Sequence, residues 1–252
     1  MTTFDNLYLS ILDEILHGEE TEYKCGRNGG TLERFGVMAS IDVFETFPLL
    51  TVRKVYPRPV LGELAAFLEG ATNIKRFKEL GCNYWDGFAD SEGNLGPIYG
   101  AQWRAFDGLT RNDQIANLVL SLTCMPNSRR HFVSAWNPTD THSMALPPCH
   151  VSFQCNVREG EILDMIVYQR SVDVILGMPA DFVLYASLME LLGNSTGLHP
   201  GMLSFMFGSA HVYETHVEKA KQMLGQQSAP QAPAFDFKGM TVDNFDPFEV
   251  EI

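Results

Sequence analysis

Hydrophobic residues recur at helical spacing in separate stretches of the chain, and each stretch predicts a helix. The first predicted helix covers residues 4–16. Its apolar face comprises Leu7, Ile11, Leu12, Ile15 and Leu16. The same spacing predicts helices over 60–70, beginning near Pro59, and over 113–122. A strongly apolar stretch predicts a further helix over 182–192.

Strand-like runs lie between these helices. They cover residues 131–136, 150–157 and 161–168, and the last two are joined by the turn Arg158-Glu159-Gly160. Segments rich in turn-forming residues predict loops at 26–30, 90–100 and 226–233. We find no internal repeat and no linker long enough to separate two domains. Residues 1–252 are therefore expected to form one α+β domain with a mixed sheet and flanking helices.

Composition narrows the classes of partner. The formal net charge is −13, which disfavours binding to a nucleic-acid backbone but leaves room for a single nucleotide held by a few arginines. No apolar run is long enough for a membrane span, and the acidic start of the chain does not resemble a secretion signal. The five cysteines show no paired spacing, which predicts a reducing compartment, the cytoplasm. No CxxC or HExxH pattern is present, so we expect no metal.

The segment Leu146-Pro147-Pro148-Cys149-His150 is a candidate for nucleophilic chemistry. Cys149 precedes a predicted strand and adjoins a histidine, although a buried structural cysteine would show the same pattern. Arg170 and Ser171 lie at the end of another predicted strand, where a guanidinium and a hydroxyl suit a phosphate. A second arginine pair, Arg129 and Arg130, is open to the alternative of a solvated surface or a salt bridge.

Several sequence blocks, taken together and in order, carry a resemblance to a known family. They are GELAAFLEGATNI, NLGPIYGAQWRAF, PNSRRHFVSAWNP, ALPPCHVSFQ, YQRSVDVILGMP and AHVYETH. In these blocks the chain resembles the thymidylate synthase family over nearly its whole length. The resemblance implies a thymidylate synthase-like fold whose sheets pack face to face in a homodimer.

The resemblance also implies roles for individual residues. Cys149 would attack C6 of a pyrimidine nucleotide, Glu63 would organise water and proton transfers, and Tyr99 would lie near the C5 proton. The nucleotide-binding residues implied are Arg27, Arg129, Arg130, Gln169, Arg170, Ser171, Asp173, Asp181, His211 and Tyr213. Of these, Arg129 and Arg130 would reach the phosphate of the other subunit, whereas His211 and Tyr213 would bind the sugar 3′-hydroxyl. The one-carbon donor implied is 5,10-methylenetetrahydrofolate, contacted by Trp85, Leu146, Asp173 and Gly177.

Asp181 departs from the family pattern, in which an Asn donates to O4 of uracil and accepts from N3–H. A carboxylate cannot donate to O4, but it accepts from the 4-amino group of cytosine. Asp181 therefore predicts dCMP as substrate, as in the viral deoxycytidylate hydroxymethylases, which it resembles. The alternative is that Asp181 is a drifted residue in a thymidylate synthase that acts on dUMP.

The fate of the one-carbon unit depends on whether water or hydride reaches the exocyclic methylene. Ala180 stands in place of a usual Phe, Phe88 stands in place of a usual Trp, and the C-terminal tail DPFEVEI is shorter than the closing segment of the family; all three features favour water. The retained Trp85 and His150 and the terminal Ile252 favour hydride transfer. We expect 5-hydroxymethyl-dCMP, with a dCMP methyltransferase, a thymidylate synthase and an inactive nucleotide-binding homologue as the alternatives.

Overall fold

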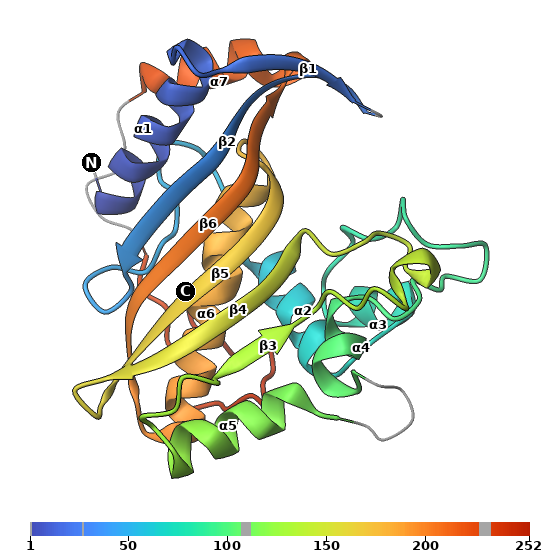
Figure 1. Cartoon of the computed structure of the whole chain (residues 1–252), viewed down its shortest axis with the longest axis vertical. Helices are drawn as coiled ribbons and strands as arrows, with labels where there is room; N and C mark the ends of the chain where they lie inside the picture. The colour runs from blue at the N-terminus through green and yellow to red at the C-terminus, as the bar shows by residue number, and fades with distance from the viewer. Residues whose placement is uncertain (1, 27, 107–111, 227–232) are drawn as a thin grey trace.

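A twisted six-stranded sheet forms the frame of the molecule (Figure 1). The computed structural model describes residues 2–26, 28–106, 112–226 and 233–252. The strand order is β1-β2-β6-β5-β4-β3, and β5 and β6 are parallel whereas the other neighbours are antiparallel. The strands are β1 (Glu22–Gly26), β2 (Gly29–Asp42), β3 (Phe132–Ser134), β4 (His150–Arg158), β5 (Ile162–Asp173) and β6 (His199–Tyr213).

The helices cover one face of this sheet and one end of it. They are α1 (Thr3–His17), α2 (Pro57–Leu68), α3 (Ile74–Glu79), α4 (Tyr99–Arg104), α5 (Gln114–Cys124), α6 (Gly177–Thr196) and α7 (Val217–Leu224), with short 3₁₀ turns η1 (Thr141–Ser143) and η2 (Glu214–His216). Helix α6 is the crossover that makes β5 and β6 parallel, and it is buried along most of its length. It ends where Gly197 adopts a left-handed conformation with φ 77°.

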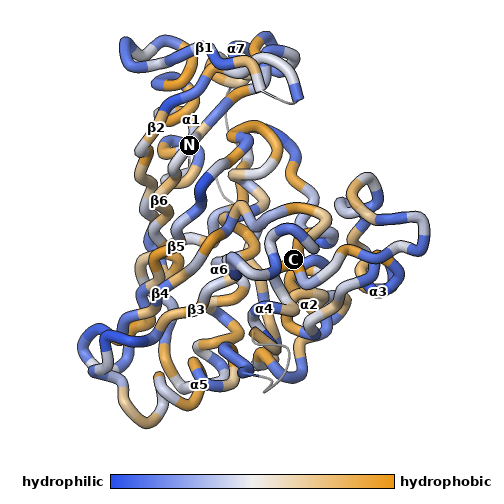
Figure 2. Tube along the Cα trace, turned by 45° about the vertical axis from the view of Figure 1, so that its right-hand side comes forward, coloured by the Kyte–Doolittle hydropathy of each residue, from blue (hydrophilic) through white to orange (hydrophobic). Residues whose placement is uncertain are grey.

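On the other face of the sheet, no helix of the described part of the chain packs against the strands (Figure 1). Large hydrophobic side chains are exposed on β2, β5 and β6, namely Phe35, Met38, Ile166, Tyr168 and Met206. Because residues alternate between the two faces of a strand, the neighbours of these residues point into the core: Val37, Ala39 and Val167 are buried. Figure 2 shows hydrophobic residues recurring along the strands and the helices behind them. Among the described residues, no helix is long and apolar enough to cross a lipid bilayer.

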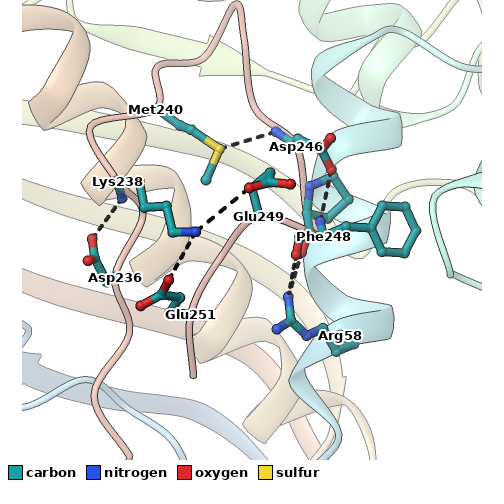
Figure 3. A network of polar contacts seen from close by, with 9 residues as sticks. Arg58, Asp236, Lys238, Met240, Asp246, Phe248, Glu249 and Glu251 are labelled. Atoms are coloured by element: carbon teal, nitrogen blue, oxygen red, sulfur yellow. Dashed lines mark hydrogen bonds and ion pairs between the residues drawn. The ribbon is translucent and has the colours of Figure 1, made fainter.

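The C-terminal segment from residue 233 packs back onto the helices (Figure 3). Asp236 and Glu251 form an isolated antiparallel bridge, and Lys238 Nζ lies 3.0 Å from Glu251 Oε1 and 3.7 Å from Glu249 Oε2. Arg58, near the start of α2, donates to the carbonyl oxygen of Pro247 at 2.8 Å. These contacts fix the last residues of the chain beside α2.

The structure confirms the α+β class and the predicted helices, with changes at their ends. Helix α6 begins five residues earlier than predicted, at Gly177, and α2 begins at Pro57. The predicted loop at 26–30 is wrong at both ends, because Gly26 closes β1 and Gly29 opens β2. The predicted strand over 131–136 shortens to β3, and the strand predicted over 161–168 extends to Asp173. Most of the predicted loop at 226–233 lies outside the described residues.

Candidate active site

Cys149 lies directly before β4, where the neighbouring strand β5 holds it. Its carbonyl oxygen accepts from the Arg170 backbone N–H at 2.9 Å. The Arg170 side chain donates to the carbonyls of Pro147 and Pro148, both at 2.8 Å, and its Nη2 lies 3.8 Å from Cys149 Sγ. The guanidinium thus holds the loop and places a positive charge beside the sulfur.

The electrostatics of Cys149 differ from the simple expectation that nearby arginines lower its pKa. Burial raises the pKa of the thiol, Arg170 partly offsets this effect, and the Asp181 carboxylate adds to it. The net pKa is above the ordinary value, since burial outweighs the guanidinium. The protein without ligand therefore holds Cys149 as a thiol.

Tyr99, the first residue of α4, completes the support of Cys149. The Cys149 backbone N–H donates to Tyr99 Oη at 2.7 Å. The Tyr99 ring stacks on Phe67 with centroids 4.9 Å apart. Burial raises the pKa of Tyr99 well above its ordinary value. Its hydroxyl therefore stays protonated and can still donate one hydrogen bond.

Asp181 is the fifth residue of α6, and both of its carboxylate oxygens have N–H partners. Oδ1 lies 3.0 Å from His150 Nε2, and Oδ2 accepts from Gln169 Nε2 at 2.8 Å. Burial lowers the pKa of His150, but the charge and the hydrogen bond of Asp181 raise it, and the net direction is upward. Asp181 is thus held as a hydrogen-bond acceptor.

Two buried polar atoms of this cluster have no hydrogen-bond partner among the described residues. They are Gln169 Oε1 and His150 Nδ1. Buried polar groups are nearly always paired in folded proteins. These two atoms are available to a bound ligand or to water.

Glu63 occupies the middle of α2, deep in the site. Its Oε1 accepts from Trp85 Nε1 at 2.7 Å. The loop that carries Trp85 approaches closely because the preceding helix residue is Gly62, where a Cβ would lie 2.2 Å from the carbonyl oxygen of Leu80. Burial raises the pKa of Glu63 to about 7, and the Trp85 hydrogen bond opposes this shift. Glu63 can therefore both give and take a proton near neutral pH.

A polar cavity of about 160 Å³ opens where β1, β2, β5 and β6 meet. Its lining comprises Gly26, Asn28, Gly29, Thr31, Glu33, Ser171, Ser209, His211 and Tyr213. The structure thus brings together Ser171, His211 and Tyr213, which the sequence singled out. Burial lowers the pKa of His211, with Asp173 and Glu33 acting in the opposite direction. Arg27, predicted to bind phosphate, lies outside the described residues.

Of the residues predicted for the folate side, Asp173 ends β5 and Gly177 begins α6, whereas Trp85 and Leu146 lie on loops. Asp173 Oδ1 accepts from the backbone N–H groups of Ile175 and Leu176, which shapes the turn that leads to Gly177. Leu146 is partly buried in the loop that precedes Cys149. The buried Trp85 ring lies 5.8 Å from that of Phe88, whose surface is 44% exposed. An exposed aromatic ring of this kind suits a flat heterocycle.

Arg129 and Arg130 lie apart from this cluster. Both are exposed and lie in the turn between α5 and β3. Figure 1 shows this turn near the lower end of the molecule, whereas β1 and the start of β2 lie at its upper end. Within one chain, these arginines are therefore remote from the polar cavity.

Sequence reasoning missed the contact between His150 and Asp181 and the place of Tyr185 in the site. His150 binds Asp181, and the Tyr185 ring lies 5.4 Å from the His150 ring. It also missed Thr31 and Glu33 in the cavity lining. The sequence shows that His150 adjoins Cys149. It does not show the contact with Asp181, because the sequence alone does not say how α6 packs against β4.

The chain matches the model of one protein family. The family is described as thymidylate synthase, and the match covers residues 6–252. Among the described residues, no three His, Cys, Asp or Glu side chains are grouped so as to hold a metal ion.

Proposed function

Because the chain belongs to the thymidylate synthase family, we propose that it transfers a one-carbon unit to C5 of dCMP and releases 5-hydroxymethyl-dCMP. Family membership supports the general reaction, which is folate-dependent one-carbon transfer to C5 of a pyrimidine nucleotide. The choice of cytosine is supported by one observation, the carboxylate of Asp181 between the N–H donors of His150 and Gln169.

The argument for cytosine concerns donors and acceptors at the pyrimidine edge. Asp181 already faces two N–H donors, so its remaining lone pairs are acceptors. The 4-amino group of cytosine would donate to one of them, and a proton shared with N3 would lie against the carboxyl group. Uracil would instead place O4 against an acceptor, and a buried mismatch of this kind costs about 1–3 kcal/mol.

In the proposed reaction Cys149 Sγ forms a bond to C6, and the electron pair of the C5–C6 bond moves to C5. A proton shared between N3 and Asp181 makes the ring a better electrophile. Burial keeps the thiol protonated before ligand binds, so the loss of its proton has to accompany nucleotide binding. Arg170, 3.8 Å away, then stabilises the thiolate.

Glu63 is the group best suited to the later proton transfers. Its pKa of about 7 allows it to hold or release a proton, and Trp85 fixes one of its oxygens. Tyr99 stays protonated and so does not itself take up the C5 proton, but its hydroxyl, held against the Cys149 backbone, can donate a hydrogen bond to the group that does.

When bound, 5,10-methylenetetrahydrofolate supplies the one-carbon unit. Its side of the site offers the exposed ring of Phe88, the buried ring of Trp85 and the turn at Gly177. Ala180, with a single methyl group, is only partly buried next to Asp181. A methyl group here takes up less room than the Phe that is usual at this position in the family, and this difference supports water as the final nucleophile rather than hydride.

We also propose that two chains associate through the uncovered face of the sheet. The exposed side chains of Phe35, Met38, Ile166, Tyr168 and Met206 give this face a hydrophobic surface that favours a protein contact. Such an arrangement would let Arg129 and Arg130, remote from the cavity of their own chain, serve the phosphate of the other.

A product assay tests the function. Enzyme and 5,10-methylenetetrahydrofolate are mixed with dCMP or, separately, with dUMP, and both dihydrofolate absorbance and nucleotide mass are followed. Turnover of dCMP with a mass gain of CH₂O and no dihydrofolate is expected. Dihydrofolate with 5-methyl-dCMP would replace the proposal with a methyltransferase, and turnover of dUMP alone would make the chain a thymidylate synthase.

A further inference from the structure

The polar cavity contains a carboxylate that the proposed reaction does not use. Glu33, on β2, lines the cavity together with Thr31, His211 and Tyr213, and only 15% of its side-chain surface is exposed. Lys24 Nζ, on the edge strand β1, lies 2.7 Å from Glu33 Oε1 and 3.3 Å from Glu22 Oε2. A negative charge inside a cavity that is proposed to hold part of a nucleotide suggests a role in recognition.

The register of the sheet places Glu33 relative to a bound nucleotide. His211 on β6 lies opposite Asp173 on β5 and opposite Glu33 on β2. The proposed base contacts are Gln169, on β5, and Asp181, on α6, which are hydrogen-bonded to each other. The proposed sugar contact, His211, lies on the neighbouring strand β6. Glu33 therefore lies one strand beyond the sugar, next to the position of O3′.

We propose that Glu33 selects nucleotides with a free 3′-hydroxyl and excludes those with a 3′-phosphate. The inference rests on the proposed function, because that function places the sugar at His211 and Tyr213. A hydroxyl group can donate to the carboxylate, whereas a phosphate brings only acceptors and negative charge. The enzyme would then accept free 5′-mononucleotides and reject 3′,5′-bisphosphates.

The charges of the residues around Glu33 also disfavour a 3′-phosphate. Burial keeps His211 neutral at pH 7 by lowering its pKa, so the imidazole supplies no positive charge for an added phosphate. Lys24 supplies one charge, but it is shared between Glu22 and Glu33 and is about half exposed to solvent. Repulsion between partly screened charges at this range corresponds to roughly tenfold in affinity per unit charge.

The test compares the dissociation constants of dCMP and deoxycytidine 3′,5′-bisphosphate for the wild type and E33Q by calorimetry. The amide keeps the shape of the side chain and removes its charge. The preference for dCMP is expected to fall about tenfold in E33Q at low salt, and this difference should shrink as salt rises. E22Q is the matched control, because Glu22 contacts the same lysine but is 70% exposed and is not part of the cavity lining.

The possible results distinguish a failure of the Glu33 inference from a failure of the proposed function. An unchanged preference in E33Q, or an equal change in E22Q, would overturn the role of Glu33 and leave the proposed function intact. If the wild type bound neither dCMP nor dUMP, the proposed function would fail and the inference would fail with it. Thermal melting of each variant establishes that a lost affinity does not reflect unfolding.

Discussion

Replacement of Asp181 by Asn is the sharpest test of the proposed base preference. The substitution keeps the size of the side chain and exchanges one acceptor oxygen for an NH₂ donor. Gln169 can adapt, because its Oε1 has no partner among the described residues and an amide flip would present that oxygen to the new NH₂. The new side chain can therefore be accommodated without an unpaired buried group between these two residues.

The magnitude follows from the two contacts that change. The variant loses the acceptor for the cytosine amino group and gains a donor for uracil O4. Each mismatch at a buried position costs about 1–3 kcal/mol. The combined swing in preference is therefore about 2–6 kcal/mol, which is roughly 30-fold to about 20,000-fold in the ratio of the two kcat/KM values.

The assay measures kcat/KM for dCMP and for dUMP with the wild type and D181N under identical conditions. Exposed Asp13 pairs with His17 on α1, far along the chain from the site residues, and D13N provides a control for the loss of a carboxylate. A ratio that stays within about threefold of the wild type in D181N would refute the donor–acceptor argument. A ratio that moved equally in D13N would refute it as well.

The remaining predictions concern the nucleophile, the buried acid and the dimer. In C149S, turnover should fall by at least about a thousandfold. The dissociation constant for dCMP, measured by calorimetry, should stay near that of the wild type. Turnover near the wild-type rate would exclude Cys149 as the nucleophile. Folding raises the pKa of Glu63 from 4.5 to about 7. Between these pH values the native state binds more protons than the unfolded state, so the free energy of unfolding falls as pH rises through this window. The fall should amount to about 3 kcal/mol and be absent in E63Q, as measured by urea unfolding at pH 4.5 and 8; identical pH dependence in both proteins would contradict the shift. An inactive R129A/R130A chain mixed and refolded with C149S should recover about a quarter of wild-type activity, because half of the dimers would carry one complete site; no recovery would argue against arginines that act across the interface.

The parts of the fold that sequence patterns predicted are those with strong local signals. Asp113 caps α5 by accepting from the Ala116 N–H at 2.9 Å, and the apolar spacing that follows marks the helix. The first turn of α6 was missed because Gly177 and Pro179 read as a turn, although Pro is tolerated in the first turn of a helix. Strand β6 was missed because it is interrupted by Pro200, Gly201 and Gly208.

Sequence motifs supplied the candidate residues of the site but not their geometry. Sequence motifs located Cys149 and Asp181, yet the contact between His150 and Asp181 depends on how β4 and α6 pack. The rise in the pKa of Cys149 was also beyond reach, because it depends on the degree of burial and the sequence shows only the neighbouring arginines. Nothing in the sequence singles out Glu33, because its position in the cavity depends on the strand register that places it opposite His211.

The pairing of β2 with β6 has a consequence for how the protein is made. The two strands are joined along most of their length, and Ser40 and Ser204, whose hydroxyls lie 2.8 Å apart, are 164 positions apart in the chain. Until β6 leaves the ribosome, a growing chain has only the short, exposed β1 to pair with β2, and one long strand edge stays open. Contacts of such long range slow folding and prolong the time during which open edges can aggregate. The central sheet and the active site beside it therefore form only after β6 has been made, and until then the N-terminal half of the chain lacks the strand that pairs with β2 along most of its length.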